Sequence, residues 1–148
     1  MSGIIWAQAK YEGSLVPYHF EFDETNRILR CRLDGRVTDE ALKEFYRLAA
    51  EYAAQTDPRA AVADLSAVTS FEASPQTIRE LAKFAPAMLD PTRPRCIVAP
   101  SPKIFGLARM FEIEGEATRP NLRVVRTPEE AWAILGVQGS QFKALLGK

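Results

Sequence analysis

Four polar residues within residues 64–74, namely Asp64, Ser66, Glu72 and Ser74, carry the chemistry that the sequence offers most clearly. Asp64 follows a short apolar run that predicts a buried strand, and α/β proteins place ligands at the carboxyl ends of such strands. Acid–base or Mg²⁺ chemistry is therefore open to it, although such sites normally gather several acids. The commoner role, which we expect, is a carboxylate that accepts backbone N–H groups of the following loop.

Ser74 stands immediately before Pro75, and a serine followed by proline is typical of the start of a helix. Its hydroxyl would then accept an N–H from the first helical turn, which stabilises the helix by about 1 kcal/mol. A phosphate on this hydroxyl would lie at the positive end of the helix dipole, while the nearby Glu72 would oppose its charge. Ser74 is thus open to three interpretations: a plain cap, a phospho-switch or partner contact, or a catalytic nucleophile.

Other reactive groups are few. His19 is the only histidine, and it lies in the middle of a strand pattern, which is typical of a surface or edge residue rather than a catalytic triad. Cys31 and Cys96 lie in two strand patterns, so we expect small buried hydrophobes and no disulfide. Dinucleotide, P-loop and nucleophile-elbow motifs are absent from the sequence. We therefore expect a non-enzymatic protein without metal or cofactor, with a hydrolase or transferase that uses Asp64 and Ser74 as an alternative.

Composition narrows the class of protein. The chain has 148 residues, 19 basic and 19 acidic, and this zero net charge argues against a general nucleic-acid binder. Hydrophobic residues make up 47% and charged residues 26%, values typical of a globular domain. No apolar run approaches the roughly 20 residues that cross a bilayer. The first residues lack the basic start of a signal peptide, and we expect a cytoplasmic protein without a transmembrane segment.

The elements that position these residues follow from hydrophobic periodicity. Alternation of apolar and polar residues predicts a hairpin of two strands, at 18–23 and 28–33. Helical spacing then predicts a helix from Thr38 to Gln55. Three later apolar runs predict buried parallel strands, each followed by a helix that begins with a Ser-Pro or Thr-Pro cap. These runs span residues 60–65, 96–99 and 122–125.

The predicted fold class is α/β, in one domain, with the order β-β-α-β-α-β-α-β-α. Alternating strands and helices favour right-handed crossovers and a mainly parallel sheet of four to five strands, to which the hairpin adds an antiparallel edge. The domain would span residues 16–136. Residues 1–15 would form an N-terminal arm or extra edge strand, and residues 137–148 a tail with one helical turn around Phe142, Leu145 and Leu146.

The run from Asp64 to Ser74 resembles the central signature of the STAS (sulfate transporter and anti-sigma-factor antagonist) domain. In that family a buried strand ends in an Asp-Leu-Ser-like step, here Asp64 to Ser66, and an acidic residue and a helix-start serine follow. The resemblance implies that Glu72 takes the acidic position and Ser74 the position that a partner kinase phosphorylates. Ala73 and Pro75 depart from the Ser or Thr and Gly that the family usually has there. The element order is also that of the family.

The helix predicted over residues 103–114 is apolar on most of its circumference. Such a helix is usually buried between a sheet and something else, which here could be a second protomer, the C-terminal tail or a lipid chain. The run from Phe105 to Phe111 is similar to segments of small bacterial STAS-like proteins that are compared with lipid-carrying Sec14-type domains. Phe105, Met110 and Phe111 are therefore candidates for an apolar-ligand, membrane-surface or homodimer face.

We predict a bacterial, non-enzymatic, STAS-like regulatory domain. It would bind a protein partner, such as a kinase or an anti-sigma-like regulator, through the loop 66–73, Ser74 and the start of the following helix. The alternative is a small module that binds an apolar ligand or lipid beside the helix 103–114.

Overall fold

The structure is a computed structural model that describes residues 17–138 and 141–145 of the chain. The arm or edge strand predicted for residues 1–15 lies outside the described residues, as does Leu146. The described elements run in the order β-β-α-β-α-β-α-β-α-β. They are β1 (Tyr18–Asp23), β2 (Ile28–Val37), α2 (Asp39–Thr56), β3 (Ala60–Phe71), α3 (Pro75–Lys83), β4 (Arg95–Val98), α4 (Pro102–Glu114), β5 (Leu122–Val125), α5 (Pro128–Leu135) and β6 (Lys143–Ala144).

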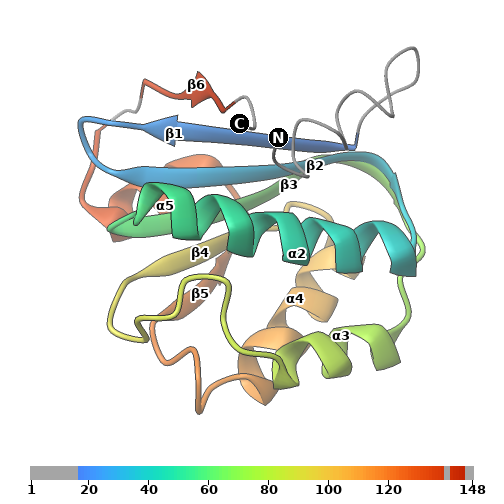
Figure 1. Cartoon of the computed structure of the whole chain (residues 1–148). Helices are drawn as coiled ribbons and strands as arrows, with labels where there is room; N and C mark the ends of the chain where they lie inside the picture. The colour runs from blue at the N-terminus through green and yellow to red at the C-terminus, as the bar shows by residue number, and fades with distance from the viewer. Residues whose placement is uncertain (1–16, 139–140, 146–148) are drawn as a thin grey trace.

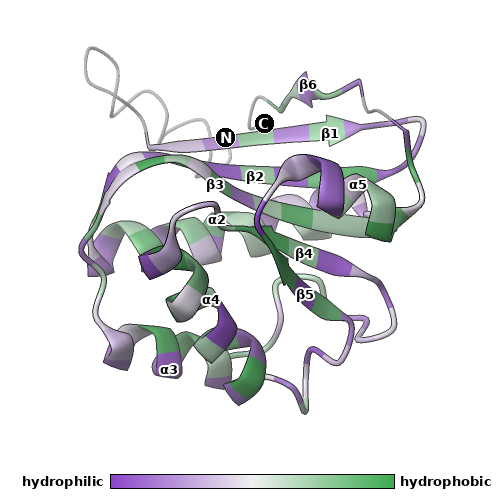
Figure 2. Cartoon of the chain, turned by 180° about the vertical axis from the view of Figure 1, so that it is seen from behind, coloured by the Kyte–Doolittle hydropathy of each residue, from purple (hydrophilic) through white to green (hydrophobic). Residues whose placement is uncertain are grey.

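The strands form one mixed sheet in the order β5-β4-β3-β2-β1-β6 (Figure 1). The four strands from β2 to β5 are parallel, and β1 pairs antiparallel with β2 on one side and β6 on the other. This arrangement confirms the predicted α/β class and its mainly parallel sheet. The helices occupy both faces, with α2, α3 and α4 on one side and α5 on the other (Figure 2).

The C-terminal tail corrects two predictions. Residues 143–144 form β6 instead of part of a helical turn, and the sheet therefore has six strands rather than four to five. The reason is a backbone partner distant in sequence: Lys143 pairs with Phe22, and the Leu145 N–H donates to the Phe20 carbonyl at 2.8 Å. The Phe142 ring packs on Trp132, with ring centroids 5.6 Å apart. The β1 strand therefore lies inside the sheet and is not its edge.

Strands β2 and β3 both run further than predicted. Their parallel pairing continues to Val37 opposite Phe71, through two register shifts. Gly35 lies between these shifts at φ +67°, a left-handed conformation that glycine adopts without a steric penalty. Most of the predicted loop 66–73 is thus strand, and that prediction is wrong up to Phe71. In contrast, β4 pairs with β3 only as far as Asp64, so the outer half of β3 extends beyond it (Figure 1).

Local capping explains where the four helices begin. Thr38, Ser74, Ser101 and Thr127 each accept a backbone N–H from the first helical turn, and proline follows the last three. The predicted caps are confirmed. Because each helix follows a parallel strand, all four helix starts lie at the carboxyl edge of the sheet, where the residues around Ser74 are also found.

Candidate functional site

Asp64 is a buried residue within β3, and its carboxylate serves the local backbone. One carboxylate oxygen accepts the Ser66 N–H at 2.9 Å, which is the role expected from the sequence. Ser66 itself is exposed on the outer half of β3 rather than in a loop. The two residues therefore stand at the point where β3 loses its β4 partner and becomes accessible.

Ser74 joins two helices. Its hydroxyl accepts the Thr77 N–H at 3.2 Å as the cap of α3, and its own N–H donates to the Asp39 carboxylate at 2.7 Å. Asp39 belongs to the first turn of α2, so this bond ties the start of α2 to the start of α3. The Ser74 N–H is the main reason why the pKa of Asp39 is lowered, with the Thr77 hydroxyl adding to the effect.

Glu72 is bonded to Arg36 and Ser70 rather than to Ser74. It is exposed, and its carboxylate accepts hydrogen bonds from the Arg36 guanidinium at 2.7 Å and from the Ser70 hydroxyl at 3.0 Å. The Arg36 bond is the largest cause of its lowered pKa. The acid bonded to Ser74 is therefore Asp39 and not Glu72. The sequence does not indicate Asp39 as a partner of Ser74, because the bond joins residues 35 positions apart.

An apolar cavity of about 180 Å³ lies between the sheet and the helices α2, α3 and α4. Its wall includes residues of β2, β3 and all three helices. Among them are Leu29, Cys31, Phe45, Ala49, Leu65, Ile78, Leu81, Ile104, Leu107, Ala108 and Phe111. Small side chains at several of these positions, such as Ala49 and Ala108, leave the space unfilled.

The three apolar residues predicted on α4 have different surroundings. Phe111 lines the cavity. Phe105 is half-buried beneath the Arg126 guanidinium, whose central carbon lies 4.0 Å from the ring centroid. Met110 is half-buried against the core, and Ile113 is 62% exposed. Only Ile104 and Ala108 of this helix are fully buried, so α4 is a surface helix with one face on the cavity.

Two arginines in the cavity wall are buried, although no pattern in the sequence indicates that they should be. Arg95 is 7% exposed and Arg119 is 3% exposed. Arg119 donates to the carbonyls of Ala82 and Phe84 at the end of α3, both at 3.0 Å. Arg95 donates to the Met88 carbonyl at 2.8 Å. Burial lowers the pKa of Arg95, and the neighbouring charge of Arg119 lowers it further.

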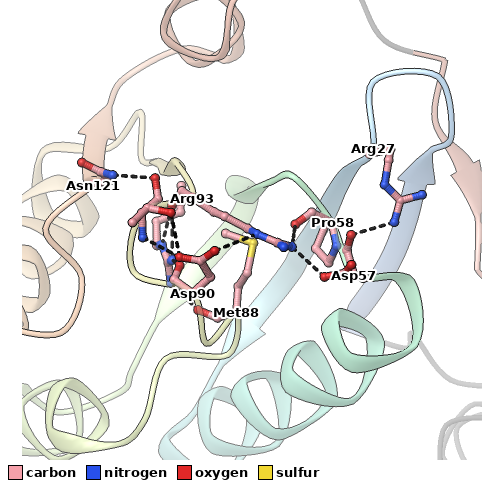
Figure 3. Close-up of polar contacts among 9 residues, drawn as sticks. Arg27, Asp57, Pro58, Met88, Asp90, Arg93 and Asn121 are labelled. Carbon is pink, nitrogen blue, oxygen red and sulfur yellow. Dashed lines mark hydrogen bonds and ion pairs between the residues drawn. The ribbon is translucent and has the colours of Figure 1, made fainter.

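The loop between α3 and β4 is fixed by a polar network at the opposite edge of the sheet from Ser74. Arg93 donates to the Asp57 carboxylate at 2.6 Å and to the Pro58 carbonyl at 2.8 Å (Figure 3). It also pairs with Asp90 at 3.3 Å. The backbone carbonyl of Asp57 accepts a hydrogen bond from the Arg27 guanidinium at 2.7 Å. These bonds hold the loop that carries Met88 against the start of β3.

The two cysteines, Cys31 and Cys96, are unreactive. Both are buried and free, as the sequence predicted. Burial raises the pKa of Cys96 to about 11 and raises that of Cys31 further still, so both thiols stay protonated at neutral pH.

In the part of the chain that the structure describes, no three His, Cys, Asp or Glu side chains gather into a metal-binding group. No helix among these residues is long and apolar enough to span a membrane.

Comparisons with known proteins find structural similarity but no match in sequence. No family model matches the chain, and no curated protein matches it. Among solved structures, the chain is similar to the cell fate determinant SpoIIAA of Bacillus in its phosphorylated form. The sequence identity is 19% and the TM-score 0.47, over 78% of this chain and 96% of that one.

Proposed function

We propose that this protein is a non-enzymatic, STAS-like regulatory domain that binds a protein partner through residues 66–74, here called the Ser74 surface. The observation that carries this proposal is the link between Ser74 and Asp39. Through it, a change at the exposed edge of the sheet reaches α2 and α3 together. The STAS-like sequence of residues 64–74 supports the same location.

The outer half of β3 gives the Ser74 surface a way to bind. Ser66, Ala67, Thr69 and Ser70 are exposed, and among the described strands β4 pairs with β3 only up to Asp64. An extended partner segment can add to such a strand edge through main-chain hydrogen bonds. The side chains along it are small, so they leave the approach open. Arg36, Glu72 and Lys103 surround its far end with charges of both signs.

Phosphorylation would act on this surface through electrostatics. A partner kinase would transfer the γ-phosphoryl group of ATP to the Ser74 oxygen, so that ADP leaves and a base of the kinase takes up the hydroxyl proton. The new charge would be favoured by the start of α3 but repelled by the Asp39 carboxylate next to it. We infer that the bond between Asp39 and the Ser74 N–H would then weaken, and that the relative position of α2 and α3 would change without unfolding of the domain.

The test compares four proteins in cross-linking mass spectrometry in cells of the source organism. These are the natural chain, Ser74→Ala, Ser74→Asp and the control Ser101→Ala, which removes the equivalent cap of α4. Cross-links from residues 66–74 to a partner should change in opposite directions for the two Ser74 variants and stay unchanged for the control. Equal cross-linking by all four proteins, or cross-links that map elsewhere, would contradict the proposal.

The cavity favours a second function, binding of a small apolar ligand. An apolar cavity of about 150 Å³ is known to remain dry and to bind a benzene-sized molecule, and this cavity is slightly larger at about 180 Å³. Calorimetric titration with 1-octanol tests the idea directly. The natural chain should bind it, and Ala108→Leu, which fills the cavity from α4, should not. Absence of binding by the natural chain would refute this function.

A further inference from the structure

Lys103 lies at the outer end of the β3 edge that β4 leaves unpaired. Its ammonium group donates to the Phe71 carbonyl at 2.9 Å. That carbonyl points away from β2, because the Glu72 N–H, on the opposite side of the same planar peptide unit, donates to the Val37 carbonyl of β2 at 2.7 Å. Lys103 therefore binds the last backbone acceptor on the free side of β3.

The positive charge of Lys103 works against the helix that carries it. Lys103 belongs to the first turn of α4, at the positive end of the helix dipole, where a cation is disfavoured. The helices α2 and α5 follow the opposite rule, because each carries two acidic residues in its first turn. The position of this lysine is therefore explained by its bond to β3 and not by a preference of α4.

The ammonium group of Lys103 has donors left for a further ligand. The residue is exposed, and the Phe71 carbonyl accepts only one of the three N–H groups. Within residues 17–138 and 141–145, no carboxylate forms an ion pair with it. Glu72 is close enough for its pKa to be lowered by the lysine charge, but that carboxylate is already bound by Arg36 and Ser70. Lys103, Arg36 and Glu72 together carry one net positive charge.

Main-chain pairing alone would give a partner little hold on this edge. Residues 66–70 are the uncharged run Ser-Ala-Val-Thr-Ser, whose side chains are small. Two register shifts interrupt the pairing of β2 with β3 along the same stretch, so the regular part of the edge is short. Charged groups at an interface fix register and suppress wrong partners more than they add affinity. A charge at the end of this edge would supply the specificity that the edge itself lacks.

We propose that the partner contributes an extended segment with a carboxylate at one end of its pairing residues, and that Lys103 binds this carboxylate. This inference rests on the partner-binding function proposed above and adds the chemistry of the partner and the residue that recognises it. The segment would lie along residues 66–70, and its acidic side chain would meet the ammonium group beside the Phe71 carbonyl. A basic segment would instead meet Lys103 and Arg36 with like charge and be rejected.

The experiment begins with selection of phage-displayed random peptides on the full natural chain and on two variants with one charge reversed. Lys103→Glu reverses the charge at the free edge of β3. Lys83→Glu is the matched control, because Lys83 is an exposed lysine at the end of α3, on the opposite edge of the sheet. Peptides enriched on the natural chain and on the control should carry Asp or Glu at one end of a β-branched run. Peptides enriched on Lys103→Glu should carry Lys or Arg there.

The most enriched peptide is then synthesised in two forms, one with its acid and one with the corresponding amide. In fluorescence anisotropy titrations, the acidic form should bind the natural chain about two- to fivefold more tightly than the amide form, which is the range of an exposed ion pair. Both forms should bind Lys103→Gln equally. Changes in the amide NMR shifts of the natural chain should gather at residues 66–72. If the Lys103 variants fail to fold, the two peptide forms on the natural chain still decide the question.

The outcomes separate this inference from the function on which it rests. Equal binding of the two peptide forms at residues 66–72 would overturn the role of Lys103 and leave the partner-binding surface intact. A preference for the acidic form that persists in Lys103→Gln would also overturn that role. Enrichment of no peptide, or shift changes elsewhere in the domain, would overturn both the inference and the proposed pairing with β3.

Discussion

Filling the cavity offers a direct test of the packing. We expect Ala108→Leu to stabilise the unliganded protein, because Ala108 lies on α4 with its side chain at the wall of the 180 Å³ space. The three added carbon atoms leave water for that space and contribute about 2.4 kcal/mol at about 0.8 kcal/mol each. Loss of leucine rotamer freedom costs about 0.5 to 1 kcal/mol. The expected net gain is about 1.5 kcal/mol, or about 5 °C in Tm for a chain of this length.

The assay is urea unfolding followed by circular dichroism, with Tm measured by calorimetry. Ala54→Leu is the control, because Ala54 is an exposed residue of α2, and its effect should stay within about 0.5 kcal/mol. A loss of 1 kcal/mol or more in Ala108→Leu is the typical result of overpacking, at about that magnitude. Such a loss would show that the wall is already in contact across the space, and it would refute both the cavity and the ligand argument built on it.

Three further predictions concern caps, pH and thiols. Ser74→Ala should lower the free energy of unfolding by about 1 kcal/mol in urea, through loss of the α3 cap. Asp39 and Glu72 have lowered pKa values in the folded protein, so they contribute stability above their ordinary values near 4 that is lost as pH falls through the folded values. The urea concentration at the midpoint of unfolding should therefore decrease as the pH is lowered below about 4. The decrease should be less steep in a variant with both acids replaced by amides. Cys31 and Cys96 should react with Ellman's reagent at pH 8 only as fast as the protein unfolds, because both are buried with raised pKa values; rapid reaction would contradict that burial.

Features encoded within a few neighbouring residues could be predicted from the sequence. The caps at Ser74 and Ser101 were found because a hydroxyl followed by proline identifies the start of a helix locally. The bond from Asp64 to the Ser66 N–H also spans only two residues. In each case the two bonded residues are only two or three positions apart, so a short sequence pattern contains both of them.

Features that depend on distant partners were missed. The sequence predicts that the strand ends at Leu33, whereas pairing with β3 carries β2 on to Val37. Strand β6 has two residues and exists only through its contact with β1. The bond of Ser74 to Asp39 and the burial of Arg95 and Arg119 likewise arise from packing between elements. Composition rules place arginine at the surface, so no pattern in the sequence indicates a buried pair.

The small strand β6 has a consequence for how this protein behaves in concentrated solution. The β1 strand carries alternating aromatic residues, Tyr18, Phe20 and Phe22, and an exposed strand of that kind recruits other chains by edge-to-edge pairing. β6 occupies the outer backbone groups of Phe20 and Phe22, and its two residues are the charged Lys143 and the small Ala144. A bulky fusion or a deletion that dislodges residues 141–145 would therefore turn a monodisperse preparation into one that aggregates through its sheet.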